Sequence, residues 1–82
     1  MPRVIMAASD GLELTGGLAE FDVVADTVGR MIRELEERFP GLGDAIDRRM
    51  AIAIDGEIHQ DAWDVALPEG AEIVLIPKIG GG

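Results

Sequence analysis

The sequence predicts an α+β domain in which one main helix lies across one face of a mixed sheet of four or five strands. The apolar residues at positions 28–39 recur with the spacing of an amphipathic helix. Shorter apolar or alternating runs on both sides of it are typical of strands, and turn residues separate them. The predicted order is strand, strand, helix, strand, short strand, strand. Long connections and a single helix favour this layout over a doubly wound one, with the last strand beside the first.

Two strands are expected before the helix. Residues 3–8 form the first, with alternate side chains on opposite faces. Residues 18–25 form the second, because apolar and acidic residues alternate there as in a half-buried antiparallel strand. Turn signals bound the intervening residues 9–17, where Leu12 and Leu14 alternate with polar residues. Two interpretations stay open there: the first strand resumes, or a loop places a leucine under the core.

The helix is expected over residues 28–39, with Asp26 or Thr27 as its N-cap. Its buried stripe has the i, i+3, i+4, i+7 spacing and consists of Val28, Met31, Ile32, Leu35 and Phe39. The opposite face is charged, as expected for a solvated surface. Pro40 and Gly41 end the helix, because the residue before a proline is displaced from helical geometry.

The second half of the chain is expected to supply three strands. Residues 41–49 are interpreted as a connector with one short turn, and residues 50–54 as the third strand. Asp55-Gly56 predicts a type I′ hairpin, since both residues tolerate positive φ angles. It leads into a short fourth strand at residues 57–60. The last strand is the apolar run at residues 73–76.

The composition excludes several classes of function. The chain has 82 residues, no cysteine and a formal net charge of -9. The absence of cysteine excludes disulfides, thiolate metal sites and cysteine nucleophiles. Such an acidic protein repels phosphate backbones and anionic lipids, so neither nucleic acid nor a membrane surface is an expected partner. The charge is interpreted as a solubility feature in preference to a device for steering a basic partner.

No targeting or catalytic motif is apparent. Residues 4–8 are too short an apolar run for a signal peptide or a spanning helix, so a cytoplasmic location is expected. His59 has no second histidine or cysteine with which to complete a metal site. No nucleophile and base are paired in the sequence, and we expect neither a catalytic residue nor a bound metal.

The end of the chain is its most unusual stretch. The last strand is stopped by Pro77 and is followed by Lys78, Ile79 and three glycines. Glycines have no side chain to pack and lose much entropy when they are fixed. We therefore expect a single domain over residues 1–79 and a flexible tail over residues 80–82.

Motifs spread along the whole chain, in a fixed order, carry a resemblance to a known family. They are Asp26-Thr27-Val28, Arg38-Phe39-Pro40-Gly41-Leu42, Ile54-Asp55-Gly56-Glu57, Leu67-Pro68-Glu69-Gly70-Ala71-Glu72-Ile73 and Ile76-Pro77-Lys78-Ile79-Gly80-Gly81-Gly82. With them the chain resembles the ThiS and MoaD sulfur carriers, which have the ubiquitin-like β-grasp fold. It departs from the family pattern at Asp55, where Asn is more frequent, at Ala71, where Asp is more frequent, and in Lys78 and the third glycine.

The resemblance implies a function as a carrier and not as an enzyme. In the family, an E1-like adenylating enzyme of the MoeB or ThiF type uses ATP to adenylate the terminal glycine, here Gly82. A sulfur donor protein then converts the adenylate to a thiocarboxylate. Activation is needed because a terminal carboxyl has a pKa near 3.5 and is an unreactive anion at neutral pH. Gly80 and Gly81 would thread the tail into the partner enzyme, and the carrier itself would bind no cofactor.

The resemblance leaves the sulfur acceptor open. We favour the small subunit of molybdopterin synthase, with a MoaE-like large subunit as acceptor, because the chain is long for a ThiS protein. Thiamine and cysteine biosynthesis remain alternatives. Two rival functions also remain: a ubiquitin-like modifier conjugated through Gly82, and a non-catalytic β-grasp binding domain with an inert tail.

A partner surface is expected at the outer face of the last strand and the root of the tail. Its candidate residues are Val74, Ile76, Pro77, Lys78 and Ile79. Apolar groups that face water beside a reactive end form a plausible docking patch. The sequence alone leaves open whether Val74 and Ile76 face a partner or the core.

Overall fold

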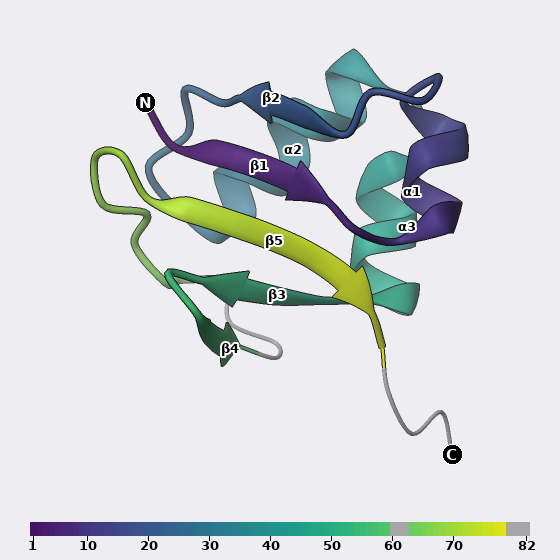
Figure 1. The fold of residues 1–82 in the computed structure, drawn as a ribbon. Coiled ribbons are helices and arrows are strands. Elements are labelled where there is room, and N and C mark those ends of the chain that lie inside the picture. Colours follow the sequence, from purple (N-terminus) through teal and green to yellow (C-terminus); the bar gives the residue numbers. More distant parts are fainter. Residues whose placement is uncertain (60–62, 79–82) are drawn as a thin grey trace.

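The computed structural model describes residues 1–59 and 63–78. In chain order its elements are β1 (Arg3–Met6), α1 (Ser9–Leu14), β2 (Glu20–Asp22), α2 (Val28–Arg38), α3 (Leu42–Arg49), β3 (Met50–Ile54), β4 (Glu57–His59) and β5 (Glu72–Pro77). The strands form one sheet in the order β2-β1-β5-β3-β4 (Figure 1). The predicted α+β class with a mixed sheet is confirmed.

The last strand occupies the centre of the sheet. β5 pairs in parallel with β1, with Ile5 opposite Val74, and antiparallel with β3, with Ala51 opposite Ile76. The prediction that the last strand lies beside the first is therefore correct. Since both edges of β5 are hydrogen-bonded, the segment that leads to the chain end starts from a strand in the centre of the sheet.

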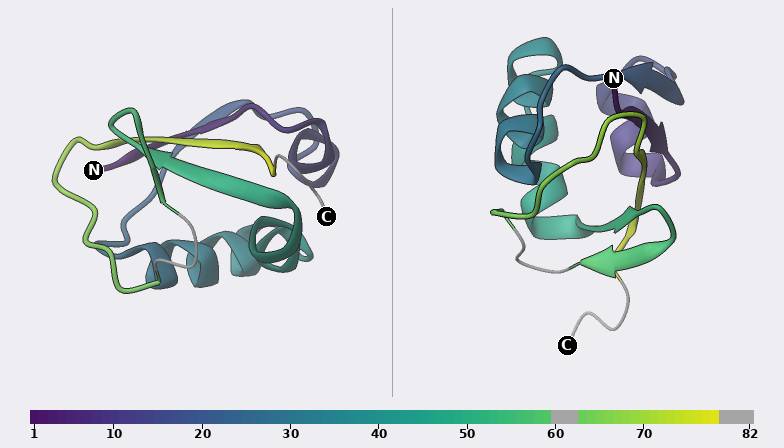
Figure 2. Two further views of the ribbon diagram at one scale, coloured as in Figure 1. Left: turned by 90° about the horizontal axis from the view of Figure 1, so that it is seen from below. Right: turned by 90° about the vertical axis from the view of Figure 1, so that its left-hand side faces the viewer.

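α2 and α3 cover one face of the sheet and leave the other face open (Figure 2). The stripe predicted for α2 supplies much of the core: Val28, Met31 and Leu35 are almost completely buried. The Thr27 hydroxyl accepts a hydrogen bond from the Arg30 backbone N–H at 3.2 Å, so Thr27 is the N-cap. From the sheet, β5 contributes Ile73 and Leu75, both fully buried.

The predicted hairpin between β3 and β4 is confirmed. Asp55 and Gly56 have φ angles of 48° and 86°, the two positive values that a type I′ turn needs. The predicted β3 matches residues 50–54, and β4 is described as far as His59.

Several local predictions were wrong, among them the first strand, which was predicted at residues 3–8 and ends at Met6. Residues 9–14 form helix α1, not a resumed strand or a loop, and residues 42–49 form helix α3, not a connector. The predicted second strand at 18–25 is shortened to β2, residues 20–22.

The shortening of β2 and the formation of α3 both depend on acidic side chains of α2. The Glu34 carboxylate accepts hydrogen bonds from the Val24 and Ala25 backbone N–H groups at 3.0–3.1 Å, so the chain turns toward α2 there. Glu36 accepts from the N–H groups of Gly41 and Gly43 at 2.9 Å each. These donors belong to the start of α3, whose own N-cap is Gly41 and provides no side-chain oxygen.

α1 forms because a glycine allows it to approach the core. Gly11 is buried, and a β-carbon at this position would lie 2.1 Å from the Met6 sulfur and 3.0 Å from the Met50 methyl. A side chain at this position would require the buried Met6 side chain to move. The Gly11 that looks like a turn signal in the sequence is therefore a packing residue.

Candidate functional site

The structure separates the two faces of β5. Ile73 and Leu75 point under the helices, whereas Val74 and Ile76 are half-buried on the open face of the sheet. The sequence left open whether Val74 and Ile76 face a partner or the core, and the structure places both on the solvent face of the sheet. Pro77 and Lys78 are exposed at the end of the strand.

Neighbouring strands extend this apolar surface. Ile5 and Ala53 flank Val74 across the sheet, and Ala51 lies opposite Ile76. Ile58 of β4 pairs with Ala53 and is 56% exposed. Paired residues project to the same face, so these side chains form one continuous apolar area. We call it the open-face strip, and its members are Ile5, Ala51, Ala53, Ile58, Val74 and Ile76.

Charged residues border the open-face strip on the side of β2. Arg3 lies within 3.7 Å of the Glu20 carboxylate and 3.9 Å of the Asp22 carboxylate. Glu72, opposite Arg3 in β5, adds a third acidic group on this face. An apolar centre with a charged rim is the usual composition of a protein interface.

The root of the tail is fixed by its backbone. The Lys78 N–H donates to the Arg49 carbonyl oxygen at 2.8 Å, which continues the pairing of β5 with the start of β3. The Lys78 ammonium is 3.4 Å from the Asp47 carbonyl oxygen. The position at which the chain leaves the sheet is therefore determined by residues at the end of α3.

Four of the predicted site residues are not placed by the structure. Ile79, Gly80, Gly81 and Gly82 lie outside the described residues. Their proposed roles stay predictions. The sequence also missed Ile5, Ala51, Ala53 and Ile58, because the strand order that brings them beside β5 is not encoded in any local pattern.

The described residues contain no other site of obvious chemistry. Within residues 1–59 and 63–78, no three His, Asp or Glu side chains are grouped as metal ligands. His59 is half-buried and lies 3.9 Å from the exposed Glu57 carboxylate, its neighbour two residues away on the same strand. None of the described helices has the length and apolar character needed to span a bilayer.

The fold defines a class, the small ubiquitin-like β-grasp proteins. The family model described as "ThiS family" matches residues 12–82. The chain belongs to the ThiS family. A comparison of its sequence with curated proteins finds no match.

Solved structures of similar proteins share the whole fold. CysO in the BexX/CysO complex from Amycolatopsis orientalis is 18% identical, with a TM-score of 0.82 and full coverage of both chains. A putative molybdopterin converting factor subunit 1 from Pyrococcus furiosus is 21% identical, with a TM-score of 0.72 over 95% of this chain and 97% of that chain. Small archaeal modifier protein 1 from Haloferax volcanii is 27% identical, with a TM-score of 0.70 over 99% and 98%. The predicted β-grasp fold is confirmed by these similar structures.

Proposed function

We propose that the protein is a sulfur carrier whose Gly82 carboxylate is adenylated and then converted to a thiocarboxylate. The observation that carries this proposal is the placement of β5. A central strand, paired on both edges, ends beside an apolar open face and leads into a sequence of three terminal glycines. Family membership supports the same conclusion.

The chemistry divides between the carrier and its partners. An E1-like adenylating enzyme would bring the Gly82 carboxylate to the α-phosphorus of ATP, releasing pyrophosphate and forming the acyl adenylate. Sulfide delivered by a sulfur donor protein would then attack the acyl carbon, so that the C–S bond of the thiocarboxylate forms as the bond from the acyl carbon to AMP breaks. The carrier supplies a tail without side chains, which fits a narrow, water-poor entry, and a folded body whose binding energy holds the tail in place.

The open-face strip is the proposed docking surface for these partners. Val74 and Ile76 lie in its centre, and Pro77 and Lys78 join it to the tail. Burial of apolar side chains at the centre of an interface contributes most of the binding energy. A partner seated on this strip would have the chain end directly beside it.

Mass spectrometry of the protein purified from its native host tests the proposal. The expected result is a species heavier than the acid by the mass difference between sulfur and oxygen, located on Gly82. A matched control is the protein without Gly80, Gly81 and Gly82, which should show no such species. If no thiocarboxylate is found under any sulfur supply, and the control protein retains full function, the tail is inert and the protein is a binding domain.

For the sulfur acceptor, we favour a MoaE-like large subunit and hence a role in molybdopterin biosynthesis in the cytoplasm. The length of the chain supports this choice over thiamine biosynthesis. The test is to mix the thiocarboxylate form with MoaE-like, ThiG-like and cysteine-synthase-like acceptors and to follow the loss of sulfur from Gly82. Sulfur transfer to one of the other two acceptors in preference to the MoaE-like subunit would refute the molybdopterin role.

A ubiquitin-like modifier is the second candidate function. The 27% identity to small archaeal modifier protein 1 supports it. A modifier would form an isopeptide bond between Gly82 and a lysine of a target protein. Conjugates of higher mass that contain this bond in a cell lysate would establish the modifier function, and their absence beside a detected thiocarboxylate would leave the carrier function alone.

A further inference from the structure

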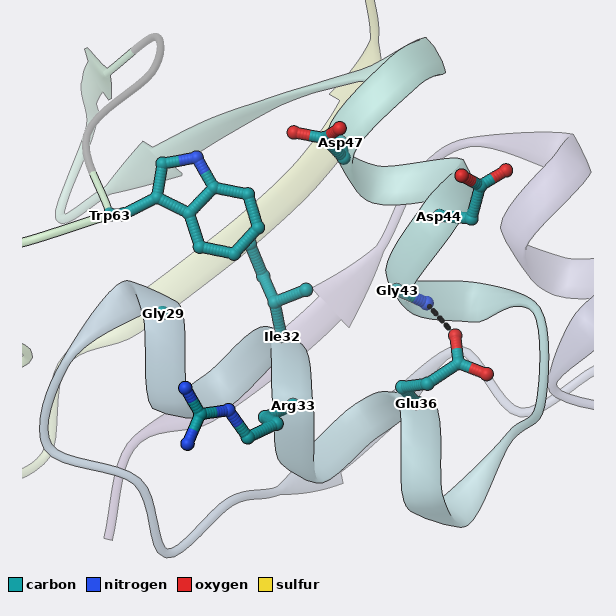
Figure 3. Close-up of a pocket in the computed structure, with 8 residues that line it drawn as sticks. All are labelled: Gly29, Ile32, Arg33, Glu36, Gly43, Asp44, Asp47 and Trp63. Carbon is teal, nitrogen blue, oxygen red and sulfur yellow. Dashed lines mark hydrogen bonds between the residues drawn. The ribbon is translucent and has the colours of Figure 1, made fainter.

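The helical face of the molecule carries a second surface that the proposed carrier chemistry does not use. A groove of about 380 Å³ lies between α2, α3 and Trp63 (Figure 3). Its volume is at the lower end of the range for sites that bind small molecules or short segments. The lining residues are Gly29, Ile32, Arg33, Glu36, Gly43, Asp44, Asp47 and Trp63.

Two glycines within helices shape this groove. The Gly29 N–H donates to the Trp63 carbonyl oxygen at 2.9 Å, and a β-carbon on Gly29 would lie 3.2 Å from that oxygen. On the facing helix, a β-carbon on Gly43 would lie 2.9 Å from the Glu36 carboxylate. A glycine inside a helix costs about 1 kcal/mol relative to alanine. Gly29 and Gly43 carry this cost, and they allow Trp63 and Glu36 to pack closely against the helices at the two ends of the groove.

Trp63 is held by its backbone while its ring stays accessible. The side chain is 45% exposed, although tryptophan is among the residues that gain most from burial. Figure 3 shows the ring extending over Ile32 toward Asp47 of α3. Ile32 itself is only 7% exposed and forms the apolar floor.

The charges around the groove indicate the chemistry of its occupant. Three carboxylates and one guanidinium line it. Glu36 is engaged with the start of α3 and Asp44 is paired with Arg48 at 2.9 Å. Asp47 has an exposed carboxylate for which no ion pair with the described residues is recorded. A lysine or arginine side chain matches all three features, since its stem covers Ile32, its cation lies over the Trp63 ring and its charge reaches Asp47.

We propose that this groove docks a lysine- or arginine-bearing segment of a partner protein, independently of the open-face strip. A second copy of the chain fits less well, because two bodies of net charge -9 repel each other. The groove is lined by residues of α2 and α3, which cover one face of the sheet (Figure 2), and the open-face strip lies on the other face. Both surfaces can therefore be occupied at once, so that one partner holds the body while another processes the tail.

The full chain provides its own reporter, because Trp63 is the single tryptophan. The probe is the peptide acetyl-Leu-Arg-Leu-amide, and the matched peptide carries citrulline, the neutral analogue of arginine. We expect the arginine peptide to change Trp63 fluorescence and the NMR shifts of the Gly29 and Gly43 amides, and to leave those of Val74 and Ile76 unchanged. The citrulline peptide should bind several-fold more weakly.

Two variants with equal net charge test the role of the groove. Asp44→Asn with Asp47→Asn should weaken peptide binding by about two- to fivefold, the effect expected from loss of one exposed ion pair with Asp47 and of the neighbouring Asp44 charge. The control, Glu13→Gln with Glu37→Gln, removes two negative charges outside the groove and should bind as the unchanged protein does. Neither pair alters a buried residue, so both should fold.

Four results would overturn the proposal. They are equal binding of the two peptides, equal weakening by the two double variants, shift changes spread over the whole surface, and a dimer in sedimentation whose formation alone changes the Trp63 fluorescence. The last would assign the groove to a contact between copies of the chain. None of these results bears on the thiocarboxylate at Gly82.

Discussion

Removing the Glu36 side chain is the sharpest test of how the helical layer is built. Both oxygens of Glu36 accept backbone N–H groups at the start of α3, from Gly41 and Gly43, at 2.9 Å. Glu36→Ala leaves both donors without this partner. Loss of a cap typically costs 0.5–2 kcal/mol, and water can replace part of it at this exposed position, so we expect a loss of about 1–2 kcal/mol in the free energy of unfolding.

Urea unfolding at neutral pH measures this loss directly. For a domain of this size, about 1–2 kcal/mol corresponds to a decrease in Tm of about 5–15 °C. Hydrogen exchange of the Gly41 and Gly43 amides should accelerate more than that of amides in β1. The control is Glu37→Ala, since Glu37 is the next residue on α2, is exposed, and makes no hydrogen bond or ion pair with another described group. This substitution should change the free energy of unfolding by no more than about 0.5 kcal/mol. Equal effects of the two substitutions would refute the capping role of Glu36.

Four further predictions concern the core, the docking surface and the tail. Gly11→Ala should lower stability by about 1–3 kcal/mol in urea unfolding, because the added carbon overlaps Met6; a gain, as is usual for Gly→Ala in a helix, would contradict the packing argument. Val74→Asp should raise the KM for adenylation by an E1-like enzyme about tenfold or more. The control is Val24→Asp, which changes a valine that is 77% exposed and lies outside the open-face strip, and it should leave the KM unchanged. Equal KM values for the two variants would exclude the strip as the docking surface. Deletion of Gly80, Gly81 and Gly82 should abolish ATP–pyrophosphate exchange by the activating enzyme without changing Tm, and persistent exchange would show that the glycine tail does not carry the reactive group. Lys78→Pro should lower the free energy of unfolding in urea by about 1 kcal/mol, because it removes the backbone N–H that bonds to the Arg49 carbonyl oxygen. Lys78→Ala keeps this N–H and should stay within about 0.5 kcal/mol of the unchanged protein. Equal values for the two variants would show that the backbone bond does not anchor the tail root.

The elements that could be predicted from the sequence are those whose signal is local. The α2 stripe, the Asp55-Gly56 turn and the apolar run of β5 each depend on residues within one turn or one strand. α3 could not be recognised because its cap comes from Glu36 in the preceding helix. β2 was predicted too long because the alternation of apolar and acidic residues continues beyond Asp22. In the structure, the backbone N–H groups of Val24 and Ala25 donate to the Glu34 carboxylate of α2 and not to a neighbouring strand.

The candidate site was predictable in part for the same reason. Val74 and Ile76 follow from the alternation within β5, but their neighbours on the open-face strip come from three other strands, and only the sheet order brings them together. The sequence also contains a signal for the groove between α2 and α3. Gly29 stands in the first turn of the predicted helix, and an unexplained glycine in a helix indicates close approach of another segment.

The end of α3 connects the two functional surfaces of the molecule. Asp47 lines the groove with its side chain and accepts the Lys78 ammonium with its carbonyl oxygen. Arg49, two residues on, accepts the Lys78 backbone N–H. The side-chain contact is long at 3.4 Å and exposed, whereas the backbone bond is 2.8 Å, so the position of the tail root depends mainly on Arg49. Glu36 fixes the start of α3, so the end of α3 can hold the tail root in one place. The side chains on the outer surface of α3 remain free to bind a second protein.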